Sequence, residues 1–353
     1  MSLLRYPSRY DINDWQDDMG NRVLHVGTIY SEFDNPLWEV NKNKKDDKTN
    51  RILANSNLKF TPTSWLVVNG TIGADISTTT GMQVYHAQSY SGSGSAGTPT
   101  GGSIVVYDRL SKIFNGSLTA TARHEFGKIN NTYVLGATFA DNNYTTNSQS
   151  GQNMYDPNFY SINNTLLTTQ RARTSVNRYR NVGAFAQAIL GYESLLFLTL
   201  SGRVDGASRL MPNNPYFAYP SASMAFNFTD LDVFKEKLPF LSSGKLRASA
   251  ALTGKEPWRQ YSTQSNLENA TSTGGGFAYS YYGGNPALKA ETSKNIEGGI
   301  ELQFFKNRVG IDFTMYKLKS IDQIINPRLS YGSGYVLRLL NGGEVENKGI
   351  EVQ

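Results

Sequence analysis

The sequence predicts an all-β fold, an antiparallel transmembrane β-barrel, and two observations predict it. Apolar and polar residues alternate along about eleven segments, so each segment would present one apolar and one polar face. The connections between segments alternate between tight turns and long polar or Gly-rich loops. Short turns at one end and long loops at the other are typical of outer-membrane barrels. We expect the sheet to close into a barrel, because lipid hydrocarbon offers no hydrogen-bond partners and every backbone N–H and C=O must then be paired within the protein.

Residues 298–317 show the alternation clearly. Ile300, Leu302 and Phe304 alternate with polar residues, and after a tight connection the second arm repeats the pattern over 309–315. Period two on both arms indicates a hairpin with one apolar face. The other predicted hairpins, each with a tight turn near its middle, span 51–77, 113–140 and 182–204, and further arms span 222–228 and 246–252.

The remaining residues divide into long connections and a polar start. We expect residues 1–50 to form a loop-rich N-terminal segment and residues 51–353 an incomplete barrel. An odd strand number and an alternation that continues to the last residue predict a fragment of a larger barrel, because single-chain bacterial barrels have even strand numbers. The long connections are 78–108, 146–172, 256–288 and 326–344.

The composition excludes several classes of protein. The 353 residues contain no Cys, which excludes a disulfide scaffold and thiolate metal sites. With 12% aromatic and only 18% charged residues the chain is unlike a disordered protein. The formal charge of +5 is small for this length and the basic residues are scattered, so we expect no nucleic-acid partner. Small residues on the apolar face (Gly70, Ala120, Ala186) favour contact with lipid over a packed core.

Motifs for catalysis or metal binding fail when their context is considered. Gly92, Gly94 and Gly97 form a G-x-G-x-x-G, but no helix follows, so a surface loop is expected. His25, His86 and His124 are isolated from other metal ligands. We therefore expect no enzyme activity, no cofactor and no metal site.

The acidic stretch 11–18 offers Asp and Asn oxygens that could hold Ca²⁺. Counted from Asp11, the positions of the EF-hand glycine and closing glutamate hold Gln16 and Arg22, so that motif fails. A solvated acidic loop is the favoured interpretation, and calcium binding stays open.

The connection 256–288 is the best candidate for a ligand-binding loop. Aromatic faces stack on sugar rings, while hydroxyl and amide groups supply hydrogen bonds. The alternative is that these rings pack the loop against its neighbours or form an interface belt. The candidate residues are Trp258, Tyr261, Phe277, Tyr279, Tyr281 and Tyr282.

Several segments resemble the SusC/RagA family of TonB-dependent outer-membrane receptors. "NGGEVENKGIEVQ" at 341–353 is similar to a signature of that family, and "ALKAETSKN" at 287–295 resembles its late barrel. Supporting blocks are 35–66, 201–230 and 245–257, where Lys255 and Glu256 replace the residues usual in the family.

The resemblance implies a 22-stranded barrel plugged by an N-terminal domain. It also implies import of oligosaccharides or peptides, energised by TonB–ExbB–ExbD through the plug, beneath a SusD-like surface lipoprotein. The plug is missing from this sequence, so we expect the chain to supply barrel wall and extracellular loops in contact with outer-membrane lipid. Arg203, Asp205 and Arg209 fall in a shared block, and we expect them to form lumen ion pairs with wall or plug rather than to touch substrate.

Two alternatives from other classes stay open at this point. One is an outer-membrane adhesin or structural barrel that uses its loops for binding. The other is a soluble β-rich sugar-binding protein. The substrate and the oligomeric state are not determined by the sequence.

Overall fold

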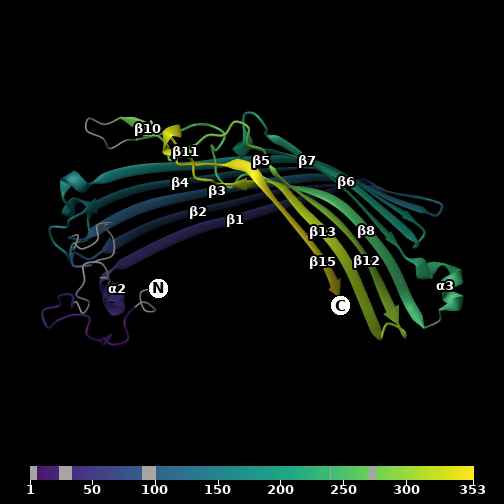
Figure 1. Cartoon of the computed structure of the whole chain (residues 1–353). Coiled ribbons are helices and arrows are strands. Elements are labelled where there is room, and N and C mark those ends of the chain that lie inside the picture. Colours follow the sequence, from purple (N-terminus) through teal and green to yellow (C-terminus); the bar gives the residue numbers. More distant parts are fainter. Residues whose placement is uncertain (1–5, 24–33, 90–100, 239, 270–275) are drawn as a thin grey trace. The chain divides into compact units, whose positions relative to one another are not determined.

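The computed structural model describes residues 6–23, 34–89, 101–238, 240–269 and 276–353. Eleven long strands form one sheet in the order β1-β2-β3-β4-β5-β6-β7-β8-β12-β13-β15 (Figure 1). Each strand therefore lies beside the next long strand of the chain, as expected for a series of hairpins. The prediction of an antiparallel all-β fold with about eleven strands is confirmed. Among the described residues, β1 and β15 are the edges of the sheet and do not pair with each other.

The first five strands are the longest, at 20 to 24 residues each. A strand needs only ~9–11 residues to cross a bilayer, so these strands extend well beyond one. They are β1 (Lys44–Thr63), β2 (Leu66–Tyr85), β3 (Ser103–Phe126), β4 (Ile129–Gln152) and β5 (Arg171–Tyr192). The later strands are β6 (Leu196–Ala207), β7 (Tyr216–Phe226), β8 (Leu241–Lys255), β12 (Glu291–Phe304), β13 (Val309–Ile325) and β15 (Leu340–Val352).

Short elements occupy the connections between the long strands. The helices are α2 (Pro36–Lys42) and α3 (Asp232–Lys237). The short strands are β9 (Leu267–Asn269), β10 (Phe277–Tyr279), β11 (Tyr282–Gly283) and β14 (Leu337–Arg338). The 3-10 turns are η1 (Ile162–Asn164), η2 (Leu167–Thr169), η3 (Ser208–Leu210), η4 (Phe228–Asp230) and η5 (Tyr331–Ser333).

The tight turns lie where the sequence predicted them. Two residues, Gly127 and Lys128, join β3 to β4, and Gly127 takes a φ of +61°, which glycine adopts without strain. The turn between β12 and β13 places Phe305, Lys306 and Asn307 at positive φ. Strand β1 begins at Lys44, seven residues before the first predicted hairpin. The sequence did not predict this extension, because residues 44–50 are all polar and give no apolar alternation.

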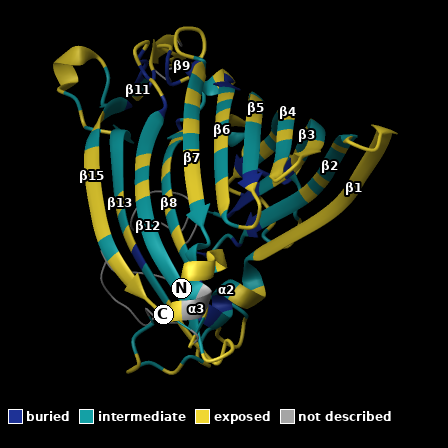
Figure 2. Cartoon of the chain, turned by 90° about the vertical axis from the view of Figure 1, so that its right-hand side faces the viewer, coloured by how far each residue is buried: buried dark blue, intermediate teal, exposed yellow. Residues whose placement is uncertain are grey.

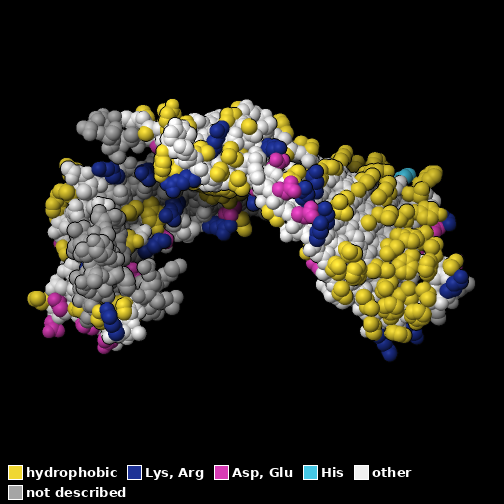
Figure 3. Space-filling model, in the orientation of Figure 1, with side chains coloured by type: hydrophobic (Ala, Val, Ile, Leu, Met, Phe, Trp, Pro, Cys, Tyr) yellow, Lys and Arg dark blue, Asp and Glu magenta, His cyan; other side chains and the backbone are white. Residues whose placement is uncertain are grey.

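One side of the sheet carries apolar side chains and the other carries charged and polar ones, because the register places residues of like character opposite each other. Residues paired across β5 to β15 share their character, so apolar residues line up in continuous rows on one side, here called the apolar face. One row is Leu190, Leu198, Met224, Ala248, Gly298, Met315 and Ile350. The next row is Tyr192, Leu196, Phe226, Leu246, Ile300, Phe313 and Val352. Figure 3 shows hydrophobic side chains gathered in the region where Figure 1 draws β8, β12, β13 and β15.

The opposite side, here called the polar face, carries ion pairs between strands that are adjacent or separated by one strand. Lys245 Nζ lies 2.6 Å from Glu301 Oε2, and Arg247 Nη2 lies 2.5 Å from Asp312 Oδ1. These charged side chains are only partly hydrated, so each is stabilised by pairing with an opposite charge. The alternation predicted for 298–317 is thus a real difference between two faces.

The chain divides into two compact units, each with a small core. In the first (Met1–Leu53, Ala74–Ile113, Asn143–Asn177), Val84, Ile104 and Met154 form a buried cluster. In the second (Ala54–Gly73, Phe114–Asn142, Arg178–Gln353), the buried cluster joins connections between strands. It contains Ala207, Leu210, Leu288, Ala290 and Leu339. Figure 2 shows the long strands intermediate or exposed along most of their length, as expected for a wall without a packed interior.

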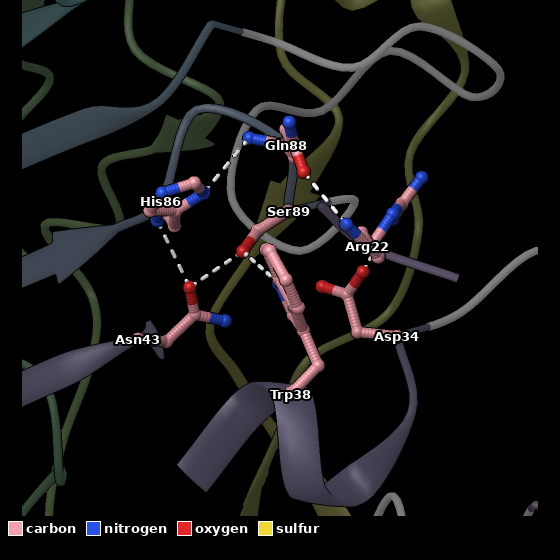
Figure 4. A network of polar contacts seen from close by, with 7 residues as sticks. All are labelled: Arg22, Asp34, Trp38, Asn43, His86, Gln88 and Ser89. Carbon is pink, nitrogen blue, oxygen red and sulfur yellow. Dashed lines mark hydrogen bonds and ion pairs between the residues drawn. The ribbon is translucent and has the colours of Figure 1, made fainter. Parts of the chain in front are cut away.

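A polar network holds the start of the chain against the end of β2 (Figure 4). The Trp38 indole N–H donates to Ser89 Oγ at 2.9 Å, and Ser89 Oγ donates to Asn43 Oδ1 at 2.6 Å. The backbone N–H of His86 donates to the same Asn43 oxygen at 3.0 Å. Helix α2 begins at Pro36 because Asn35 caps it by accepting from the Leu37 N–H.

Candidate functional site

The predicted aromatic loop forms an exposed surface in the connection between β8 and β12. Trp258, Tyr261, Phe277, Tyr279 and Tyr281 are each at least half exposed, and Phe277 reaches 77%. Tyr282 is partly buried, with the Arg259 guanidinium 3.7 Å from its ring centroid. Large aromatic side chains exposed together are unusual on a surface without a partner. The part of this loop at 270–275 lies outside the described residues.

A second connection, 326–339, packs beside this loop and adds to its surface. Strands β11 and β14 pair in parallel, and the N–H groups of Val336 and Leu337 both donate to the Tyr281 carbonyl at 3.1 Å. The Tyr279 and Tyr335 rings lie 5.1 Å apart, and Tyr331 is exposed. We call the exposed rings of both connections, together with the half-buried Tyr335 that packs against Tyr279, the aromatic platform. Its members are Trp258, Tyr261, Phe277, Tyr279, Tyr281, Tyr331 and Tyr335.

Two hydrogen bonds, one buried and one exposed, hold the platform in place. Asn285, itself buried, donates from Nδ2 to the Leu339 carbonyl at 2.9 Å and so joins the two connections. Asn213 Nδ2 donates to the Pro286 carbonyl at 2.9 Å and links the loop between β6 and β7. The platform therefore rests on bonded segments rather than on a free loop.

The three predicted lumen residues divide into two separate ion pairs on the polar face and its edge. Arg203 Nη2 lies 2.7 Å from Asp205 Oδ1 and donates to Thr138 Oγ1 at 2.9 Å. Arg209 instead pairs with Glu256, at 2.6 Å between Nη1 and Oε1. The sequence did not single out Thr138 or Glu256 as partners.

Arg203, Asp205 and Glu256 line a hollow of about 380 Å³, here called the polar hollow. Asn181 Nδ2 donates to Glu256 Oε1 at 2.9 Å, while Glu256 Oε2 and Asn181 Oδ1 are buried without a hydrogen-bond donor. Tyr219 and Phe217 add aromatic surface to the lining.

The acidic stretch 11–18 uses its carboxylates for local turns. Asp17 accepts from the backbone N–H groups of Met19 and Asn21, at 3.0 and 2.7 Å. These bonds, with one from the Asn21 side chain as the leading cause, lower the pKa of Asp17. Asp11 accepts from Asn13 in the same way.

The remaining motifs add no site. Within the described ranges, no group of three or more His, Asp or Glu residues could hold a metal ion. His86 belongs to the network of Figure 4, and His124 is exposed on β3. His25 and the glycines 92, 94 and 97 lie outside the described residues. No described helix is long and apolar enough to cross a membrane.

Comparison with known proteins decides the family. The sequence model of the TonB dependent receptor-like β-barrel matches residues 2–353. The chain belongs to this receptor family. TonB-dependent receptor P26 of Formosa agariphila is 24% identical over 334 residues, which is 92% of this chain and 33% of that protein. TonB-dependent receptor P3 of the same organism is 29% identical over 188 residues, 52% of this chain and 19% of that protein.

The receptor barrel also has a close structural counterpart. The RagAB peptide importer in its "closed-closed" state superposes with a TM-score of 0.81 at 19% identity, over 95% of this chain and 37% of that chain. At this identity the match shows the fold, which is the one that the SusC/RagA resemblance implied. The predicted receptor family is confirmed. The chain spans a third or less of the curated relatives P26 and P3.

Proposed function

We propose that this receptor barrel is the wall and extracellular loop region of an outer-membrane importer of oligosaccharides or peptides. TonB–ExbB–ExbD would energise uptake through a plug domain, and a SusD-like lipoprotein would cover the loops. No covalent chemistry is required of this chain, since binding and gating perform import.

The aromatic platform is the observation that carries the proposal. It is aromatic, largely exposed and held by a buried hydrogen bond between the two connections, and it lies at the end of the sheet that has the long connections. Family barrels place their long loops outside the cell. Rings of this kind stack on sugars or on the apolar side chains of peptides. Trp258, Tyr261, Phe277, Tyr279, Tyr281 and Tyr282 are thus proposed to contact cargo or lid.

The polar hollow supports transport rather than adhesion. Arg203, Asp205, Arg209 and Glu256 are proposed to form a hydrated, charge-balanced wall over which cargo passes. Because each charge has a partner, the wall would offer hydrogen bonds without trapping ions. An adhesin would need the platform but not such a path.

The test uses the protein expressed from its complete gene and purified in detergent. Binding of neutral oligosaccharides and of short peptides is measured by calorimetry for wild type and for Tyr279→Ala/Tyr281→Ala. Two aromatic contacts contribute ~1–3 kcal/mol, so the variant should bind one cargo class about 5- to 150-fold more weakly. Phe305→Ala, which removes an exposed ring at the opposite end of the sheet, is the matched control. Equal binding by all three proteins would refute the platform as a cargo site.

The lid is tested separately by co-purification of a surface lipoprotein with the same variants. Loss of the lipoprotein with retained cargo binding would assign the platform to the lid. Retention of both would remove the platform from the proposed function.

A further inference from the structure

The apolar face carries a groove that the import function does not use. It crosses β1 to β7, has a volume of about 820 Å³ and lies entirely within the second unit. Side chains on its rim include Ile72, Leu118, Phe139, Val182, Val204 and Tyr216, all of which are more than 40% exposed. We call it the outer groove. Its volume falls in the range of ~300–1,000 Å³ that is typical of small-ligand pockets.

Small residues create the depth of the outer groove. Gly70, Ala137, Ala184 and Gly206 lie between the larger rim residues. A Cβ at Gly206 would come within 2.9 Å of the Tyr216 ring and 3.1 Å of a Val182 methyl group, so even alanine would crowd that end. A flat lipid-facing wall would need no such hollow.

Two arginines continue the same face of β5 directly beyond the groove. Strand residues alternate between faces, so Arg178 and Arg180 point to the same side as Val182 and Ala184. They lie on the side of the groove nearer the long connections, because β5 begins at Arg171 after the connection from β4. In an outer membrane that side is the outer leaflet's headgroup region.

The two guanidinium groups share a single carboxylate. Arg178 Nη2 lies 2.5 Å from Asp141 Oδ2, and Arg180 Nε lies 3.2 Å from the same oxygen. The cluster therefore keeps one positive charge in excess, and both arginines remain substantially exposed. The excess charge and the free N–H groups suit a phosphate, which guanidinium binds with two parallel hydrogen bonds.

A smaller hollow of about 300 Å³ lies at the arginines themselves. Arg178 and Arg180 line it together with Ser208, Arg209 and Tyr261. The Arg180 backbone N–H donates to Ser208 Oγ at 2.8 Å, which fixes the strand against this hollow. An apolar groove is thus followed by a cationic, hydroxyl-lined hollow along one strand.

We propose that the outer groove binds a phosphorylated, acylated glycolipid of the outer leaflet. An acyl chain lies in the groove, and the phosphate contacts Arg178 and Arg180 at the edge of the smaller hollow. This inference rests on the proposed outer-membrane location but not on the cargo. A second copy of the barrel is disfavoured as the occupant, since a two-fold axis along the membrane normal would bring the arginines of both copies to the same height.

The test is native mass spectrometry of the protein expressed from its complete gene and extracted from its own outer membrane in mild detergent. Wild type should retain a phosphorylated glycolipid. Arg178→Gln/Arg180→Gln should retain it about tenfold less or lower, because charge-assisted bonds to phosphate are lost. Ala184→Trp, which fills the groove, should have the same effect.

Matched controls separate the groove from general changes in charge and bulk. Arg51→Gln removes an arginine that pairs with Asp75 on the polar face, and Ala188→Trp adds the same ring on the apolar face outside the groove. Both should retain the glycolipid as wild type does. Heat-dependent mobility on a gel confirms that each variant has formed its barrel.

Three results would overturn the proposal. These are a folded wild-type barrel without glycolipid, equal retention by groove variants and controls, or a second copy bound across the groove in place of lipid. Cargo binding is measured on the same samples and should be unchanged in all groove variants. If the wild-type protein binds cargo but retains no glycolipid, the groove proposal is refuted and the proposed function is not. If the protein is absent from the outer membrane, the proposed function is refuted, and the groove proposal, which depends on that location, is refuted with it.

Discussion

Placing a charge at Leu200 tests which side of the wall faces lipid. Leu200 lies in the body of β6 on the apolar face and is 43% exposed. Its register partners are Ala188 on β5 and Ala222 on β7, so an arginine at this position would find no carboxylate in its row. Ala250 and Ile296 continue the row and are equally apolar.

The cost follows from the depth of this position in the bilayer. An arginine on the lipid side of a barrel strand costs ~2–4 kcal/mol near the midplane. That corresponds to a fall of about 30- to 1,000-fold in the folding equilibrium constant of Leu200→Arg. Some barrel could still assemble if the arginine side chain extended to the membrane–water interface. A position in the middle of the strand makes that difficult.

The assay measures assembled barrel by heat-dependent gel mobility in outer membranes, for the protein expressed from its complete gene. The control is Gln187→Arg, which adds the same charge on the neighbouring strand but on the polar face, opposite Ser201. We expect near-normal assembly for the control and loss of assembly for Leu200→Arg. Normal assembly of Leu200→Arg, or a larger defect in the control, would refute the assignment of faces.

Three further predictions concern the polar contacts. Asp205→Asn leaves the Arg203 guanidinium without its ion pair and should cost about 1–2 kcal/mol in urea unfolding, which Arg203→Gln in the same chain should largely restore. Asn285→Ala removes the bond to the Leu339 carbonyl and should speed hydrogen exchange in 326–339 at least severalfold, with no change in β6. Burial, and secondarily Lys42, lower the pKa of His86, so the unfolded chain protonates first as pH falls below ~6.5. The network of Figure 4 should therefore open on acidification, seen as faster exchange of residues 34–43 when compared with His86→Gln.

Local patterns determined most of the fold in advance. Alternation over 298–317, turn lengths and the order of connections are properties of neighbouring residues, and each strand pairs with the next long strand. The apolar rows followed because a register with one continuous apolar side leaves few alternatives. The outer ends of several strands were not predicted. Strand β1 starts at Lys44, and β2, β3, β4, β5 and β15 run into the connections expected at 78–108, 146–172 and 326–344. These extensions are rich in polar residues and show no clear alternation.

The sites depended on contacts between distant segments. The aromatic content of 256–288 was visible, yet Tyr331 and Tyr335 joined the platform only through the pairing of β11 with β14. Arg209 stood in the same family-like block as Asp205, and an ion pair with wall or plug was expected, but its partner Glu256 was not named by the sequence. Such partners are set by how connections fold over the end of the sheet, which no local pattern encodes.

The sequence by itself determined the family, the strands and the two faces of this receptor barrel, because these arise from period-two alternation and from residue blocks read in order. Only the tertiary structure decided where the wall is hollowed. The outer groove brings together residues of neighbouring strands that are far apart in the chain, from Ile72 to Tyr216. Its depth depends on small residues meeting across strands, and its charge depends on Arg178 and Arg180 facing one Asp141. These relations exist only once the register is formed.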